Sequence, residues 1–99
     1  MNFKISISDE AKSDLWEIRQ YLARFGENPP RKFKESFDNF LCQVSERPCM
    51  FSEYAPNPAY RKAVIEFEYS VFYRVDETLG AVKIYRVLHG RRNYEKIIE

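Results

Sequence analysis

The sequence is poor in the residue types that build metal sites and disulfide frameworks. Its 99 residues include one histidine and two cysteines, and Cys42 and Cys49 lie seven positions apart with no Cys-x-x-Cys pair. This spacing does not match a structural zinc site, so we expect no metal, and no cofactor either. Cys42 falls inside a predicted helix, where a small buried side chain is the simplest interpretation.

Long apolar runs and an excess of one charge are also missing. No stretch approaches the roughly 18 uncharged apolar residues of a membrane span, and residues 1–6 lack the apolar core of a signal peptide. We therefore expect a cytoplasmic protein that contacts no membrane, in a compartment where a disulfide is not expected. The net charge is only +1, so any attraction to nucleic acid has to come from a local patch.

What the sequence does have is enough apolar material for one folded domain over residues 1–99. Hydrophobic residues make up 44% of the chain and aromatic residues 16%. The alternation of apolar and polar residues predicts a strand at 2–7. A helix is predicted at 9–25, because Ser8 can cap it and one apolar face recurs at helical spacing. That face consists of Ala11, Leu15, Ile18, Leu22 and Phe25.

A second helix is predicted at 30–46. Asn28-Pro29-Pro30 restarts the chain, and proline is well placed in the first turn of a helix. The apolar face consists of Phe33, Phe37, Phe40, Leu41 and Val44. Since only about four residues join the two helices, they should form an antiparallel hairpin, which needs a further surface to bury its apolar faces.

An irregular loop is predicted at 49–59. Three strands follow it, at 60–66, 69–75 and 81–88. The chain then continues as a basic tail at 89–99, which is expected to form a short helix or a docked arm. Helices and strands that do not alternate indicate an α+β fold. We expect an N-terminal strand and an antiparallel helical hairpin packed on an antiparallel β-sheet with a C-terminal three-strand meander. The sheet face away from the helices should carry open Tyr, Arg and Lys side chains.

The charge of the chain is concentrated near its C-terminus. Five cations and one anion lie between residues 83 and 96, whereas eleven cations and fourteen anions make up the rest. A local positive pole on a nearly neutral protein suggests a surface for a polar or anionic partner.

Four segments together resemble the RelE/ParE superfamily of toxins from bacterial type II toxin–antitoxin systems, and the ParE branch in particular. They are Ala11–Ile18 with Tyr21, Ser45–Pro48, Tyr69–Val75 and, most specifically, Val87-Leu88-His89-Gly90-Arg91-Arg92. The resemblance implies a growth-inhibiting toxin of the plasmid-stabilization type, held inactive by a cognate antitoxin that lies in its groove and on its sheet. It also implies DNA gyrase as the target, or alternatively ribosome-dependent cleavage of messenger RNA. The toxin itself is not expected to contact operator DNA.

Two sets of residues follow from this resemblance. An RNA-cutting site needs a general base, a general acid and fixed cations on the phosphate, and the candidates for these roles are Arg61, Arg86, His89, Arg91 and Tyr94. Candidates for contact with the target or antitoxin are Arg61, Tyr73, Arg74, Arg86, His89, Arg91, Arg92 and Tyr94. The near-neutral charge and a loop at 49–59 without lysine or arginine favour the gyrase poison over the enzyme.

Structural roles compete with each of these assignments. Arg86, in the middle of an apolar strand, needs a partner, and an ion pair with Glu66 or Glu68 is the alternative to external contact. His89 can be a packing residue at a strand end, and Arg91 with Arg92 can be a solvated basic end. Trp16 is expected to pack along the edge of the helical hairpin.

Overall fold

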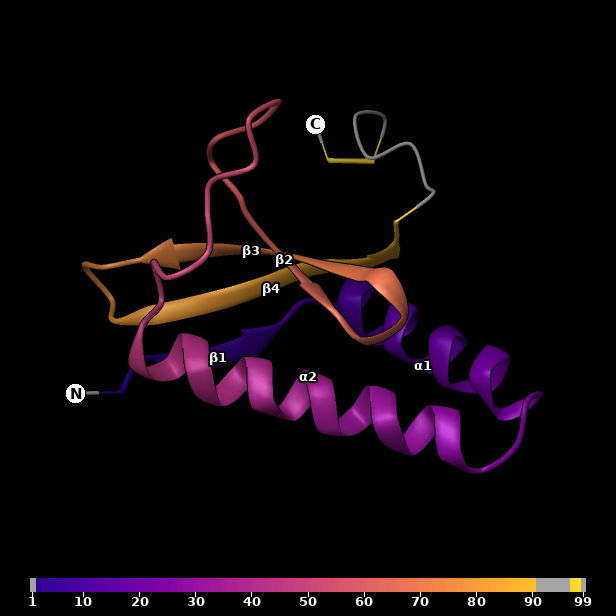
Figure 1. Ribbon diagram of the computed structural model, residues 1–99. Helices are drawn as coiled ribbons and strands as arrows, with labels where there is room; N and C mark the ends of the chain where they lie inside the picture. The colour runs from indigo at the N-terminus through magenta and orange to yellow at the C-terminus, as the bar shows by residue number, and fades with distance from the viewer. Residues whose placement is uncertain (1, 91–96, 99) are drawn as a thin grey trace.

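The protein folds into two helices packed on one side of a four-stranded sheet (Figure 1). The computed structural model describes residues 2–90 and 97–98. The elements are β1 (Lys4–Ile7), α1 (Asp9–Ala23), α2 (Asn28–Glu46), β2 (Arg61–Ile65), the short 3-10 turn η1 (Glu66–Glu68), β3 (Tyr69–Asp76) and β4 (Ala81–His89). This arrangement confirms the predicted α+β class with a helical hairpin on the sheet.

The sheet is mixed, with the strand order β1-β4-β3-β2. The last three strands form the predicted antiparallel meander. The first strand departs from the expected antiparallel sheet, because β1 pairs with β4 in parallel, from Lys4 opposite Ala81 to Ile7 opposite Ile84. A parallel partner needs a long crossover connection, and the helices, β2 and β3 together supply it.

Helix α1 starts where the sequence predicts and ends before Phe25. The Ser8 side chain accepts a hydrogen bond from the backbone N–H of Ala11 at 3.0 Å, which caps the first turn. Because the last helical residue is Ala23, Phe25 leaves the helical register and is 63% exposed instead of buried. Trp16 is 64% exposed and does not pack along the hairpin edge as expected. The residues of the apolar face that are buried are Ala11, Ile18 and Leu22.

Helix α2 begins at Asn28, two residues earlier than predicted, and lays its aromatic face on the sheet. The buried residues of this face are Phe33, Phe37, Phe40 and Val44. Cys42 is exposed, which corrects its expected burial. It lies two positions before Val44, about 200° around the helix, and therefore on the solvent side. Both Cys42 and Cys49 are free thiols.

The sheet face away from the helices is less open than the sequence suggested. The segment after α2 passes the edge of the sheet and rises on this side (Figure 1), and it buries a second apolar cluster. The cluster consists of Tyr54, Tyr60, Phe72, Leu88 and Ile98, with Tyr85 and Ile97 packed against it. The loop and the end of the chain therefore cover part of a face that was expected to be free. No helix within residues 2–90 and 97–98 is both long enough and apolar enough to cross a membrane.

Tyr73 lies in the main core and makes the free energy of unfolding depend on pH in the alkaline range. Its side chain is fully buried and its hydroxyl donates a hydrogen bond to the carbonyl of Pro48 at 2.9 Å. Burial raises the pKa of Tyr73 from 10.0 to about 12. The unfolded chain ionises first, so the contribution of Tyr73 is complete below pH 10 and is lost as the pH rises from there towards 12.

We therefore expect the free energy of unfolding to fall by up to about 1.4 kcal/mol per pH unit through this group. Urea unfolding of the wild type and of Tyr73→Phe, measured from about pH 9 to pH 11, separates Tyr73 from the other tyrosines. The stability advantage of the wild type over Tyr73→Phe should shrink above pH 10. An advantage that does not change with pH would contradict this assignment.

Candidate functional site

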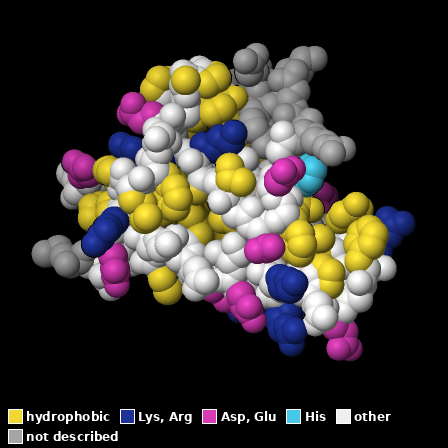
Figure 2. Space-filling model, in the orientation of Figure 1, with side chains coloured by type: hydrophobic (Ala, Val, Ile, Leu, Met, Phe, Trp, Pro, Cys, Tyr) yellow, Lys and Arg dark blue, Asp and Glu magenta, His cyan; other side chains and the backbone are white. Residues whose placement is uncertain are grey.

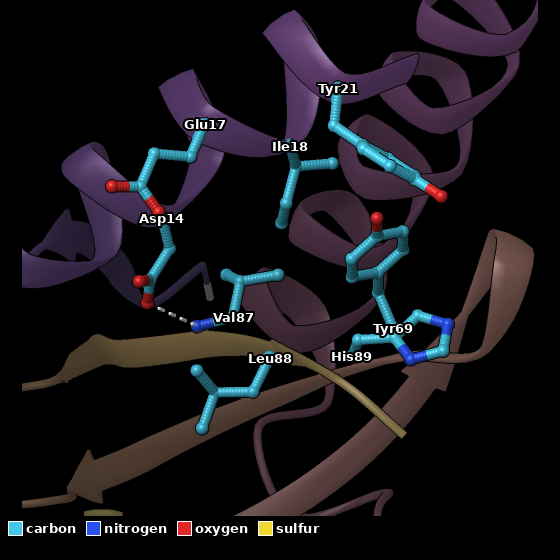
Figure 3. A pocket seen from close by; sticks show the side chains of 8 residues that line it. All are labelled: Asp14, Glu17, Ile18, Tyr21, Tyr69, Val87, Leu88 and His89. Atoms are coloured by element: carbon cyan, nitrogen blue, oxygen red, sulfur yellow. Dashed lines mark hydrogen bonds between the residues drawn. The ribbon is translucent and has the colours of Figure 1, made fainter. Parts of the chain in front are cut away.

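A groove opens between α1 and the C-terminal half of β4. Its cavity has a volume of about 300 Å³ and is lined by Asp14, Glu17, Ile18, Tyr21, Tyr69, Val87, Leu88 and His89 (Figure 3). The groove exists because β1 stops at Ile7 and α1 takes its place beside β4. At the junction the backbone N–H of Ser8 donates to the carbonyl of Ile84 at 2.9 Å, and the Ser8 hydroxyl donates to the carbonyl of Tyr85 at 2.6 Å.

Asp14 closes one end of the groove and holds Arg86 in place. Its carboxylate accepts hydrogen bonds from Nε of Arg86 at 2.7 Å and from Nη2 at 2.9 Å. The Oδ2 atom also accepts the backbone N–H of Val87 at 3.0 Å. The side chain of Arg86 is 22% exposed and that of Asp14 is 10% exposed. The hydrogen bonds from Arg86 to Asp14 raise the pKa of Arg86, although burial alone would lower it.

This ion pair corrects the expected partner of Arg86, which is neither Glu66 nor Glu68. Reasoning from the sequence missed Asp14, although a signal was present. Asp14 lies three residues after Ala11 and four before Ile18, inside the apolar stripe of α1. A carboxylate on a buried helical face needs a partner from another element, and Arg86 supplies it.

Aromatic side chains line the other end of the groove. Tyr21 lines the groove and is 50% exposed, and Phe25, outside the lining and 63% exposed, packs edge to face on Tyr21 with ring centroids 5.4 Å apart. Tyr69 packs against His89 at 5.3 Å, and burial raises the pKa of Tyr69. Figure 2 shows hydrophobic side chains gathered beside His89. Exposed aromatic rings such as those of Tyr21 and Phe25 are typical of surfaces that bind other proteins.

The other candidate residues lie elsewhere. Arg61 donates from Nη1 to the carbonyl of Phe51 at 2.7 Å and to that of Cys49 at 3.4 Å, so it fastens the loop after α2. Tyr73 is buried beneath the helices and presents no side chain to a partner, which corrects its predicted place on the binding surface. Arg74 is exposed on the face away from the helices. Arg91, Arg92 and Tyr94 lie outside the described residues.

The structure does not bring Arg61, Arg86 and His89 together around one phosphate. On β3, Arg61 is paired with Tyr73 and His89 with Tyr69. These pairs lie four residues apart, or roughly 13 Å along the strand. The ionisable residues that line the groove beside His89 are Asp14 and Glu17, with the two tyrosines, and no lysine or arginine is among the described residues that line it. Nor does any group of three or more metal-ligating side chains occur within the part of the chain that the structure describes.

Comparison with known proteins places the chain in a family. The profile of the family described as "ParE toxin of type II toxin-antitoxin system, parDE" matches residues 5–94. A comparison with proteins of curated function finds no match.

Two solved structures share the fold. A chain of the toxin–antitoxin complex RelBE2 from Mycobacterium tuberculosis superposes with a TM-score of 0.67 at 21% identity, over 90% of this chain and 99% of that chain. A chain of the chromosomal ParDE system from P. aeruginosa gives a TM-score of 0.61 at 17% identity, over 88% and 95%.

Proposed function

Because the chain belongs to the ParE toxin family of type II toxin–antitoxin systems, we propose that it arrests growth by binding DNA gyrase through protein–protein contact. In this proposal residues 1–99 are one toxin domain that acts in the cytoplasm. A cognate antitoxin neutralises it by covering the surface that meets the target. The two similar structures are described as toxin–antitoxin systems, which supports an antitoxin as the partner.

The observation that carries the choice of target is the composition of the groove beside His89. An enzyme that cleaves RNA without a metal needs cations on the reacting phosphate. Arg86 forms an internal ion pair with Asp14, which neutralises its charge. Arg61 donates a hydrogen bond to a backbone carbonyl of the loop after α2. The carboxylates of Asp14 and Glu17 would instead repel a phosphate in the groove. These features favour a protein target over an RNA substrate.

The aromatic end of the groove is the surface that we propose for contact with gyrase. Tyr21 offers a half-exposed ring that lines the groove with His89 and Tyr69, and the exposed ring of Phe25 extends this surface by packing on Tyr21. Tyrosine is among the residues that most often dominate binding energy at protein interfaces. Arg74, Arg91 and Arg92 remain candidates for contact with the target or the antitoxin on other parts of the surface.

We expect the purified protein to inhibit the supercoiling of relaxed plasmid DNA by gyrase at micromolar concentration and to accumulate the cleaved-DNA complex. Supercoiling at the normal rate with a micromolar excess of the protein would refute the proposal. Primer extension on translated messages tests the alternative function. Codon-linked cuts that disappear in His89→Ala would identify a ribosome-dependent endoribonuclease instead.

A further inference from the structure

Three exposed cations lie on the sheet face that points away from the helices. We call Lys4, Arg74 and Lys83 the cationic row; all three are exposed. Side chains alternate between the two faces of a strand, and the chain neighbours of these cations pack in the core beneath the helices. These neighbours are Phe3, Ile5, Tyr73, Val75, Val82 and Ile84.

The cationic row places like charges directly opposite each other. Lys83 is paired with Arg74 on β3 and with Ser6 on β1. Like charges in direct cross-strand register destabilise a sheet. Neither of the two ion pairs among the described residues involves the row. Asp76, on the same face, accepts the backbone N–H of Leu79 at 3.0 Å and so stabilises the turn after β3.

Arg74 is held in an orientation suited to carboxylates. Its guanidinium lies 5.4 Å from the centre of the Tyr60 ring, and Tyr60 in turn stacks on Tyr85 with centroids 4.9 Å apart. A guanidinium lying over a ring keeps its edge N–H donors available for bidentate binding. Tyr60 is only 7% exposed, so this face offers no free ring of Tyr60 on which a nucleobase could stack.

We propose that the cationic row binds an extended, carboxylate-rich segment of the antitoxin. Residues i and i+2 of an extended segment point the same way and lie about 7 Å apart, so two carboxylates of one segment can reach Arg74 and Lys83 together. The inference rests on the proposed function, which supplies the antitoxin as the partner. Binding of such a segment also explains why Arg74 and Lys83 lie opposite each other despite their repulsion, since the bound carboxylates neutralise both charges.

A labelled decapeptide of alternating glutamate and threonine serves as the probe. Fluorescence anisotropy at about 50 mM salt, where surface charges are weakly screened, compares the full-length wild type, Lys83→Glu and Lys32→Glu. Lys32 is an exposed cation on α2, so its variant makes the same change in net charge on the opposite layer. We expect Lys83→Glu to weaken binding by about tenfold or more and Lys32→Glu by less than about twofold.

Thermal unfolding separates a binding role from a structural one. Lys83→Glu places an acid opposite Arg74, so the melting temperature should stay the same or rise while peptide binding falls. A lower melting temperature, or equal weakening in both variants, overturns the proposal. So does tighter binding of a labelled ten-nucleotide oligothymidine that is lost in Lys83→Glu. Lys83→Glu expressed alone should still arrest growth, and failure of the wild type to do so would count against the proposed function instead.

Discussion

Replacing Asp14 with alanine is expected to lower the free energy of unfolding by roughly 3 kcal/mol, the largest loss of stability that we expect from a single substitution. The change leaves the guanidinium of Arg86 without its partner in a mostly buried position. It also removes the acceptor of the Val87 backbone N–H, and an unpaired buried donor is costly. Guanidinium chloride unfolding, monitored by circular dichroism, measures the loss.

The matched control for this prediction removes both charges. In Asp14→Leu combined with Arg86→Met no charge is left unpaired, and only the N–H of Val87 lacks its acceptor. The double variant should therefore lose about 1 kcal/mol. If the single and double variants lose the same stability, the ion pair is not what holds α1 to β4.

Removing the aromatic end of the groove is expected to have the largest effect on activity. Tyr21→Ala combined with Phe25→Ala should raise the concentration that half-inhibits gyrase by at least about 30-fold, because rings that dominate an interface contribute about 2 kcal/mol or more. The fold should survive, since both side chains are at least half exposed. Supercoiling assays with the purified variant measure the effect.

Trp16 provides the control for that experiment. It is 64% exposed on the same helix, but its side chain points about 140° away from Tyr21 around the helix axis. Trp16→Ala should change the inhibitory concentration by less than about threefold. Equal losses in Trp16→Ala and in the double variant would show that the groove is not the contact surface.

The helices and the meander could be predicted because their signals are local. The spacing of Phe33, Phe37, Phe40 and Val44 indicates a helix and its buried face without reference to any other element. The parallel pairing of β1 with β4 could not be read in the same way, because strand periodicity is the same for either direction of the partner. The second apolar cluster could not be predicted either, because Tyr54 lies in an irregular loop and the pattern around Ile98 allows a short helix or a docked arm without indicating the surface on which it packs.

Only part of the candidate site could be predicted from the sequence. The sequence indicates His89 as part of a distinctive segment, and the structure places it in the groove, while its role in binding stays a prediction. Tyr21 and Phe25 were interpreted through the family motif and the apolar stripe, and their exposure depends on where α1 ends. Arg86 was expected to need a partner, but its partner lies 72 positions away. Some cations form ion pairs with carboxylates of the same chain and others stay free to bind a partner. The difference depends on contacts between residues that are far apart in the sequence.

The parallel pairing of the first and last strands has a consequence for the timing of synthesis. Ser8 and Tyr85, which meet at this junction, are separated by 77 positions, so β1 has no partner until nearly all of the chain has been translated. Contacts this distant form late and slow folding. A polypeptide released early by the ribosome lacks β4, the strand against which both β1 and α1 pack, and cannot complete its core. We therefore expect that only full-length molecules reach the fold that a neutralising partner must recognise, and that polypeptides truncated before β4 do not contribute to toxicity.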